Sequence, residues 1–435
     1  MSYPRTIEYL YGLQKHGMKF GLDNIRRLLS LFDDPQKSFR AVHIAGTNGK
    51  GSTSAMIECM LRTAGIRTGL FTSPHLISFT ERIRINGEEI REDDVIALAG
   101  EVRTAADRIE DFSPTFFEVV TAIAFLHFKK SGVEWAVIET GLGGRLDATN
   151  VVIPEVAVIT RIGLDHCEFL GKTLGEVASE KAGIIKDGIP VVSAGQEAPV
   201  MKVLENRAAE KKAPLYRYGE AFTSELISET FRGISLRYEG RARYEELQVP
   251  LAGRHQMVNA ATAVKAVEIL MEKYPEMRCN VSKGLLAARW PGRLEMANET
   301  PPVLIDGAHN PQAALALSQF LKEVALLRYK RIILVAGAMG DKDIGGILDP
   351  LLPLASEILF ASPAYGRSAP PERLASYAAS KGYSAIITQS VADALGKAED
   401  IYLDGDLIVV TGSFYTIGEA KEFFGNKGVL TRLRE

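Results

Sequence analysis

The hydrophobic and polar positions of this chain follow two periods along most of its length. Short, nearly continuous apolar runs, which are typical of buried strands, lie at residues 41–45, 67–71, 135–140, 156–162 and 190–193. Apolar residues at helical spacing lie around and between them, at residues 5–32 with a break at Gly21, 53–64, 118–130, 174–185, 198–211 and 256–273. Strands that alternate with helices predict a parallel sheet covered on both faces, with functional loops at the carboxyl ends of its strands.

Two stretches depart from this alternation. Residues 222–249 combine short alternating strands with charged turns, which predicts an antiparallel sheet. Residues 289–303, RWPGRLEMANETPPV, contain three prolines and indicate a domain boundary. Strands then resume at residues 303–305, 331–336, 357–361, 385–388 and 407–411. We therefore expect an α/β protein with two domains, residues 1–297 and a smaller one at residues 298–435.

Composition narrows the class of protein. With 46% hydrophobic and 24% charged residues, the chain is typical of a globular protein, and a net charge of −3 offers no basic stripe for DNA or RNA. Its three cysteines lie far apart and indicate neither a disulfide framework nor a zinc site. The N-terminal segment lacks the pattern of a signal peptide, and no apolar run reaches membrane-spanning length. We expect a cytoplasmic protein without a membrane partner.

The stretch AVHIAGTNGKGSTS, residues 41–54, joins a strand to a helix through a glycine-rich loop. Backbone N–H groups, the helix N-terminus and Lys50 together form an anion site, and a nucleotide phosphate is the natural guest. The spacing differs from G-x-x-x-x-G-K-[ST], because Ile44 stands at the first glycine and Gly51 at the serine or threonine. An ordinary strand-to-helix turn is the structural alternative.

Polar residues follow three of the predicted strands of the first domain: Ser73, Glu139 and His166. A hydroxyl, a carboxylate and an imidazole at one sheet edge suit Mg²⁺ that is also bound through water and substrate phosphate. Each residue has a structural alternative. Ser73 suits a turn before Pro74, and His166 suits a helix cap or a core hydrogen bond. Glu139 ends an apolar run, where a buried carboxylate needs a cation.

Lys181, in SEKAGIIK, lies on a helix with an apolar face, and helical spacing leaves its direction open. A lysine is normally solvated, but a buried one beside cations loses its proton and becomes a nucleophile toward CO₂. In the second domain, DGAHNP (residues 306–311) and GAMGDKD (residues 337–343) follow strands and place further polar residues at strand ends. Arg293 lies in the linker and can reach either domain.

These motifs together resemble those of the folylpolyglutamate synthases, which in many bacteria are also dihydrofolate synthases. The similar motifs occur in order over residues 21–418: GTNGKGS, SPHL, FFE, GLGGRLDATN, DH, EKAGIIK, HQMVNA, GR, DGAHNP, DKD and TGS. The resemblance implies a Mur-type ATP-dependent amide ligase. It further implies an N-terminal P-loop NTPase-like domain with a mainly parallel sheet and a smaller, Rossmann-like C-terminal domain that takes part in glutamate ligation.

The resemblance also implies roles for individual residues. ATP would contact Gly49, Lys50, Gly51, Ser52, Asn259, Arg293 and Asp306. One Mg²⁺ would be bound by Ser73 and Glu139, and a second by His166 with a carbamylated Lys181. The pterin of a folate substrate would lie against Thr115, Phe116, Phe117, Glu118, Leu146, Asp147 and Ala148. His309 would lie near the incoming glutamate, and it joins Lys50 and Lys181 as an expected catalytic residue.

The resulting expectation is a monomeric ligase that uses ATP to join L-glutamate to folate polyglutamates and to dihydropteroate, through an acyl phosphate. A folylpolyglutamate synthase without dihydrofolate synthase activity is the nearest alternative. A cell-wall Mur ligase usually carries an extra N-terminal domain, whereas 40 residues precede the phosphate-loop strand here. A nucleotide-gated binding protein would not need Glu139, His166 and Lys181.

Overall fold

The computed structural model describes residues 2–16 and 21–425, so residues 17–20 of the expected helical segment 5–32 lie outside the described residues. The first domain is built on a sheet that, among the described residues, has eight strands in the order β4-β3-β2-β5-β1-β6-β7-β8. The strands are β1 (Arg40–Ala45), β2 (Thr68–Phe71), β3 (Ile83–Ile85), β4 (Glu88–Glu89), β5 (Trp135–Glu139), β6 (Val156–Ile159), β7 (Val191–Ser193) and β8 (Leu215–Arg217). All pair in parallel except β3 and β4 at one edge, which confirms the expected mainly parallel sheet.

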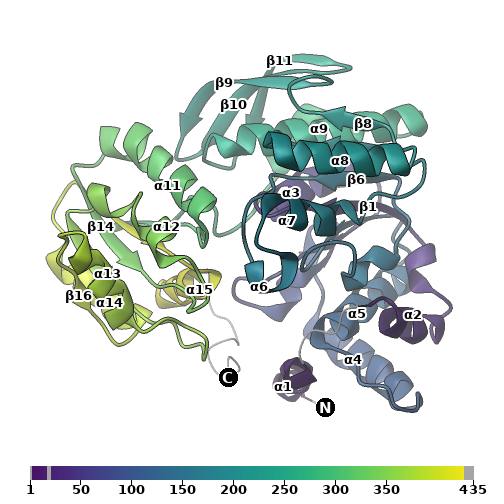
Figure 1. Cartoon of the computed structure of the whole chain (residues 1–435), viewed down its shortest axis with the longest axis horizontal. Coiled ribbons are helices and arrows are strands. Elements are labelled where there is room, and N and C mark those ends of the chain that lie inside the picture. The colour runs from purple at the N-terminus through teal and green to yellow at the C-terminus, as the bar shows by residue number, and fades with distance from the viewer. Residues whose placement is uncertain (1, 17–20, 426–435) are drawn as a thin grey trace.

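Helices cover both faces of this sheet (Figure 1). One face packs Val42 and Ile44 of β1 against α3 (Lys50–Thr63), α9 (His255–Lys273) and α10 (Val281–Ala287). The other face is covered by α1 (Tyr3–Gly12), α2 (Asp23–Ser30), α4 (Glu92–Ala106) and α5 (Phe116–Lys130) on one side, and by α7 (Leu174–Ala182) and α8 (Ala198–Glu210) on the other. Burial on both faces explains why the strands are continuously apolar.

The predicted antiparallel segment is confirmed. It forms β9 (Thr223–Thr230), β10 (Gly233–Glu239) and β11 (Arg243–Val249), which lie above α9 in Figure 1. Its inward residues Ile234, Leu236 and Tyr238 join the core that includes α9. This sheet extends the first domain without contributing a strand to the central sheet.

The second domain is built on a six-stranded sheet, counted over the described part of the chain, in the order β12-β13-β17-β14-β15-β16. Its strands are β12 (Glu295–Glu299), β13 (Pro302–Ile305), β14 (Arg331–Ala336), β15 (Glu357–Phe360), β16 (Ile386–Ile387) and β17 (Asp406–Thr411). One face carries α11 (Pro311–Glu323), α12 (Ile344–Leu348) and α13 (Pro371–Ser380), and the other carries α14 (Val391–Ile401) and α15 (Phe414–Phe423). Antiparallel β12 begins at Glu295, inside the segment expected to close the first domain.

No helix in residues 2–16 and 21–425 is long and apolar enough to cross a membrane. The central strand β1 does contain one buried ionisable group. His43 is fully buried, its Nε2 lies 2.8 Å from Thr149 Oγ1, and its Nδ1 has no hydrogen-bond partner among the described residues. Burial, aided by the charge of Lys186, lowers the pKa of His43 to about 3. The imidazole is therefore neutral in the folded domain.

This burial predicts a pH-dependent stability. In the unfolded chain His43 gains a proton below its ordinary pKa of 6.5, whereas the folded protein accepts none until about pH 3. Protonation of His43 therefore leaves the free energy of unfolding unchanged above about pH 6.5, and it lowers that free energy as the pH falls toward 3. Between pH 7 and pH 5 we expect the free energy of unfolding to fall in the wild type, and to fall by about 2 kcal/mol less in His43→Gln. Urea unfolding followed by tryptophan fluorescence measures the difference, and equal losses would contradict it.

Candidate active site

A cavity of about 1620 Å³ lies between the two domains, at the carboxyl ends of their strands. Parallel α/β sheets place their loops and ligand sites at this edge. Every residue nominated from the sequence lines it: Gly49, Lys50, Gly51, Ser52, Ser73, Thr115, Phe116, Phe117, Glu118, Glu139, Leu146, Asp147, Ala148, His166, Lys181, Asn259, Arg293, Asp306 and His309. The structure therefore brings together the whole predicted set, from strands far apart in sequence.

The glycine-rich loop at residues 46–51, which is expected to bind phosphate and is called the phosphate loop here, has close neighbours at two of its glycines. Gly49 has a φ of 89° just before α3, and a Cβ there would lie 2.4 Å from Asn259 Oδ1. A Cβ on Gly51 would lie 2.6 Å from the ring of Trp290, so a serine or threonine there, as in the common motif, would require that ring to shift. The packing of Asn259 of α9 against Gly49 and of Trp290 of the linker against Gly51 thus favours small residues in this loop.

Glu139 ends β5, beside Ile44 of β1, and only 3% of its surface is exposed. Its Oε1 lies 3.8 Å from Lys50 Nζ, whereas its Oε2 has no hydrogen-bond partner among residues 2–16 and 21–425. Burial raises its pKa to about 7 against the opposing charges of Lys50 and Arg293. A carboxylate with an unmatched oxygen beside a phosphate loop is suited to a divalent cation.

Lys181 is buried rather than solvated. Its side chain extends from α7 to the phosphate loop, where Nζ donates a 2.8 Å hydrogen bond to the carbonyl of Gly46. Burial and the charge of Lys50 lower its pKa to about 7. A substantial fraction of this lysine is therefore an uncharged amine at neutral pH, which is the reactive form.

His166 directly precedes the short helix α6 (Cys167–Leu170), with a left-handed φ of 51° and no side-chain capping bond. The cap interpretation therefore fits its position but not its imidazole, which lines the cavity. Among the described residues, no group of three or more His, Cys, Asp and Glu could hold a metal ion. Any ion here would need mixed donors such as Ser73, Glu139, His166 and Lys181, together with substrate oxygens.

The wall expected to bind pterin combines polar residues that hold the local fold with aromatic rings. Thr115 and Glu118 form a capping box on α5, with Glu118 Oε2 accepting from the Thr115 N–H at 2.7 Å. Asp147 accepts from the Leu142 N–H at 2.8 Å and from Thr149, so it holds the neighbouring loops together. The rings of Phe116 and Phe117 supply the aromatic surface between these anchors.

The linker and the second domain contribute a different chemistry. Asp306 is buried and accepts from the N–H groups of Leu294 and Ala308, so its carboxylate fixes the linker against β13. The guanidinium of Arg293 lies 4.5 Å from the centre of the Phe414 ring. His309 Nε2 lies 3.3 Å from Asp165 Oδ2, which places the imidazole at the junction of the two domains.

Comparison with known proteins agrees with this architecture. Residues 44–267 match the Mur ligase middle domain, and residues 292–414 match the Mur ligase glutamate ligase domain. The chain is 38% identical to a dihydrofolate synthase/folylpolyglutamate synthase of Bacillus subtilis, over 97% of this chain and 99% of the relative. It belongs to the folylpolyglutamate synthase/dihydrofolate synthase family.

Solved structures of this family show the same two-domain fold. The Mycobacterium tuberculosis folylpolyglutamate synthase complexed with ADP and AMPPCP superposes with a TM-score of 0.90 at 33% identity, covering 98% of this chain and 100% of that chain. Escherichia coli FolC in complex with DHPP and ADP gives 0.85 at 31% identity, covering 97% of each chain. The expected family and fold are thus confirmed, and the chain is an ATP-dependent ligase.

Several cavity residues of this ligase were given no role from the sequence. They are Asn48, Asp165, Gln256, Gln312, Lys342, Tyr365, Arg367 and Tyr415. Gln256 supports the phosphate loop, since its Nε2 donates to Ser52 Oγ at 3.3 Å and its Oε1 accepts from Asn259. Asp165 and Lys342 stood only within the short motifs DH and DKD, and no spacing rule indicates that they meet.

Replacing Lys50 tests the phosphate site. We expect Lys50→Ala to reduce ATP-dependent ligation by about 100-fold or more, because a full positive charge next to the phosphates is lost. The side chain is part-buried and lies near Glu139 and the Thr47 carbonyl, neither of which needs it for packing, so the fold should survive. Circular dichroism and thermal unfolding provide the control. A global loss of structure, or full activity, would contradict the assignment.

Proposed function

We propose that this ligase joins L-glutamate to the carboxylate of folate polyglutamates, and to dihydropteroate, through an acyl phosphate. The observation that supports this proposal is that one cavity is lined by three different surfaces. A phosphate loop with Lys50 and Glu139 forms one, the aromatic pair Phe116 and Phe117 forms the second, and the domain that matches the glutamate ligase model forms the third.

The reaction requires activation because a carboxylate is a poor acyl donor. A carboxylate oxygen of the acceptor attacks the γ-phosphorus, the bond from that phosphorus to the bridging oxygen breaks, and ADP leaves. The glutamate amine then attacks the acyl carbon, loses a proton, and displaces inorganic phosphate. Lys50 would neutralise charge on the transferred phosphoryl group, and the interdomain cavity would keep water from the acyl phosphate.

The donor set fits bound Mg²⁺. Ser73 and Glu139 would hold one ion, for which the unmatched Oε2 of buried Glu139 supplies a ligand atom. His166 and a carbamylated Lys181 would hold a second. Bound Mg²⁺ would neutralise phosphate charge. The uncharged Lys181 amine would form an N–C bond to CO₂ and release a proton, which converts a cation into an anionic oxygen ligand.

The acceptor would lie against the aromatic wall. Phe116 stacks on Tyr11 with ring centres 5.4 Å apart, and Phe117 stacks on Phe71 at 5.9 Å, so both rings are fixed before a flat pterin arrives. His309, at the junction of the domains, would lie near the incoming glutamate. A folylpolyglutamate synthase without the dihydropteroate activity would use the same wall, and a cell-wall Mur ligase is the less supported alternative.

A two-acceptor assay tests the proposal. Purified protein is incubated with ATP, Mg²⁺ and labelled L-glutamate, and with either dihydropteroate or a reduced folate monoglutamate. We expect labelled product with each acceptor and none without ATP. Product with the folate alone would restrict the enzyme to polyglutamate extension. Product with neither acceptor would contradict the proposed function.

Lys181 provides a test of carbamylation. We expect Lys181→Ala to lower the ligation rate by about 100-fold or more, since an anionic group near the phosphate loop is missing. Short carboxylates such as acetate or formate should partly restore the rate by occupying the space of the carbamate. Lys172→Ala, an exposed lysine just before α7, is the matched control and should respond to neither change. Full activity of Lys181→Ala would exclude this role.

A further inference from the structure

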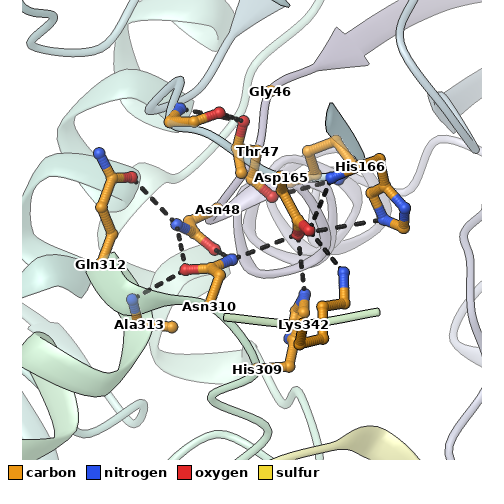
Figure 2. Close-up of polar contacts among 12 residues, drawn as sticks. Gly46, Thr47, Asn48, Asp165, His166, His309, Asn310, Gln312, Ala313 and Lys342 are labelled. Atoms are coloured by element: carbon orange, nitrogen blue, oxygen red, sulfur yellow. Dashed lines mark hydrogen bonds and ion pairs between the residues drawn. The ribbon is translucent and has the colours of Figure 1, made fainter. Parts of the chain in front are cut away.

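The carboxylate of Asp165 joins the two domains. It lies on the loop after β6 of the first domain, and Figure 2 shows side chains of the second domain converging on it. Lys342 Nζ lies 2.5 Å from Oδ1, and His309 Nε2 lies 3.3 Å from Oδ2. Asn310 Nδ2 donates to Oδ2 at 3.4 Å. One carboxylate of the first domain is therefore contacted by an ammonium, an imidazole and an amide group of the second.

A second set of interdomain hydrogen bonds, called the second joint here, lies beside it on the phosphate loop and involves Asn48, Asn310 and Gln312. Asn48 and Asn310 exchange amide hydrogen bonds, at 3.0 and 3.3 Å, and Asn48 Nδ2 also donates to Gln312 Oε1 at 3.3 Å (Figure 2). Asn310 in turn caps α11 by accepting from the Ala313 N–H at 3.0 Å. The start of α11 is thus tied directly to the turn that holds the phosphates.

The Asp165–Lys342 pair is largely removed from water. The two side chains are only 8% and 10% exposed, yet the residues come from different domains. A buried charge whose partner is withdrawn is costly unless it is hydrated again. If the domains separate, both charges regain water, whereas if they meet, each depends on the other. The pair therefore exists only in the arrangement in which the cavity has both walls.

We propose that Asp165 and Lys342 are positioning residues that hold the second domain against the phosphate loop in the ligation-competent arrangement. This inference rests on the proposed function for its reaction, but its structural content is separate. The pair acts through the arrangement of the domains, with the Asn48–Asn310–Gln312 joint keeping the register. Neither residue is assigned contact with the reacting atoms.

A double-mutant cycle with Lys342→Met and Asp165→Asn tests the proposal. Each single variant should lower kcat by about tenfold, which corresponds to about 1.4 kcal/mol, and the double variant should lose little more than either single one. Small-angle X-ray scattering in the presence of ATP should show a larger radius of gyration for each variant than for the wild type. Lys322→Met, an exposed lysine of α11, is the matched control and should match the wild type in both measurements.

Additive losses in kcat, or variants that lose activity while their scattering stays that of the wild type, would overturn the positioning role. The second outcome would instead make Lys342 a catalytic residue. Gln312→Leu removes one hydrogen bond of the second joint without touching a charge, and it should also expand the scattering profile. Failure of the proposed function would be recognised separately, because the wild type itself would then form no product while its scattering still responded to Lys342→Met.

Discussion

The burial of charge in one interdomain cavity is the constraint on which the rest of this structure depends. Glu139, Lys181 and Asp165 all have side chains that water barely reaches. Such charges are stable only when a partner, a ligand or a neighbour from another element satisfies them. Lys50 and the Gly46 carbonyl of the first domain contact Glu139 and Lys181, whereas Asp165 is contacted from the second domain, so the cavity also depends on how the domains are placed. The phosphate loop, the linker and the start of α11 are the elements that fix this placement.

Hydrogen bonding distinguishes the residues that maintain the shape of the cavity from those available to bind a ligand. Thr115, Glu118, Asp147 and Asp306 form hydrogen bonds with neighbouring residues of the fold, and they shape the walls of the cavity. Glu139 keeps an unmatched buried oxygen, which the fold alone does not explain. This difference matters for mutagenesis, because substitutions of the first group will disturb loops whether or not these residues touch a substrate.

Much of the site could be predicted from the sequence because parallel strands share a carboxyl edge. That rule is enough to bring Ser73, Glu139 and His166 to one place without knowledge of the helices. It could not show that Lys181 points inward, because helical spacing fixes neighbours on a helix but not the rotation of that helix toward the loop at Gly46. It also could not show the contact of Asp165 with Lys342, because the local pattern of hydrophobic residues does not indicate how two domains are oriented. The glycine at position 51 illustrates the same limit, because the ring that crowds this position belongs to Trp290 in the distant linker.

The central claim is that ATP activates the carboxylate of the acceptor, and the fate of a carboxylate oxygen tests it most directly. The acceptor is prepared with ¹⁸O in its reacting carboxylate, ligation is run to completion, and the inorganic phosphate is analysed by mass spectrometry. An acyl phosphate pathway predicts that one ¹⁸O atom appears in each phosphate released. Phosphate without ¹⁸O, with the label retained in the product or lost to water, would contradict the account.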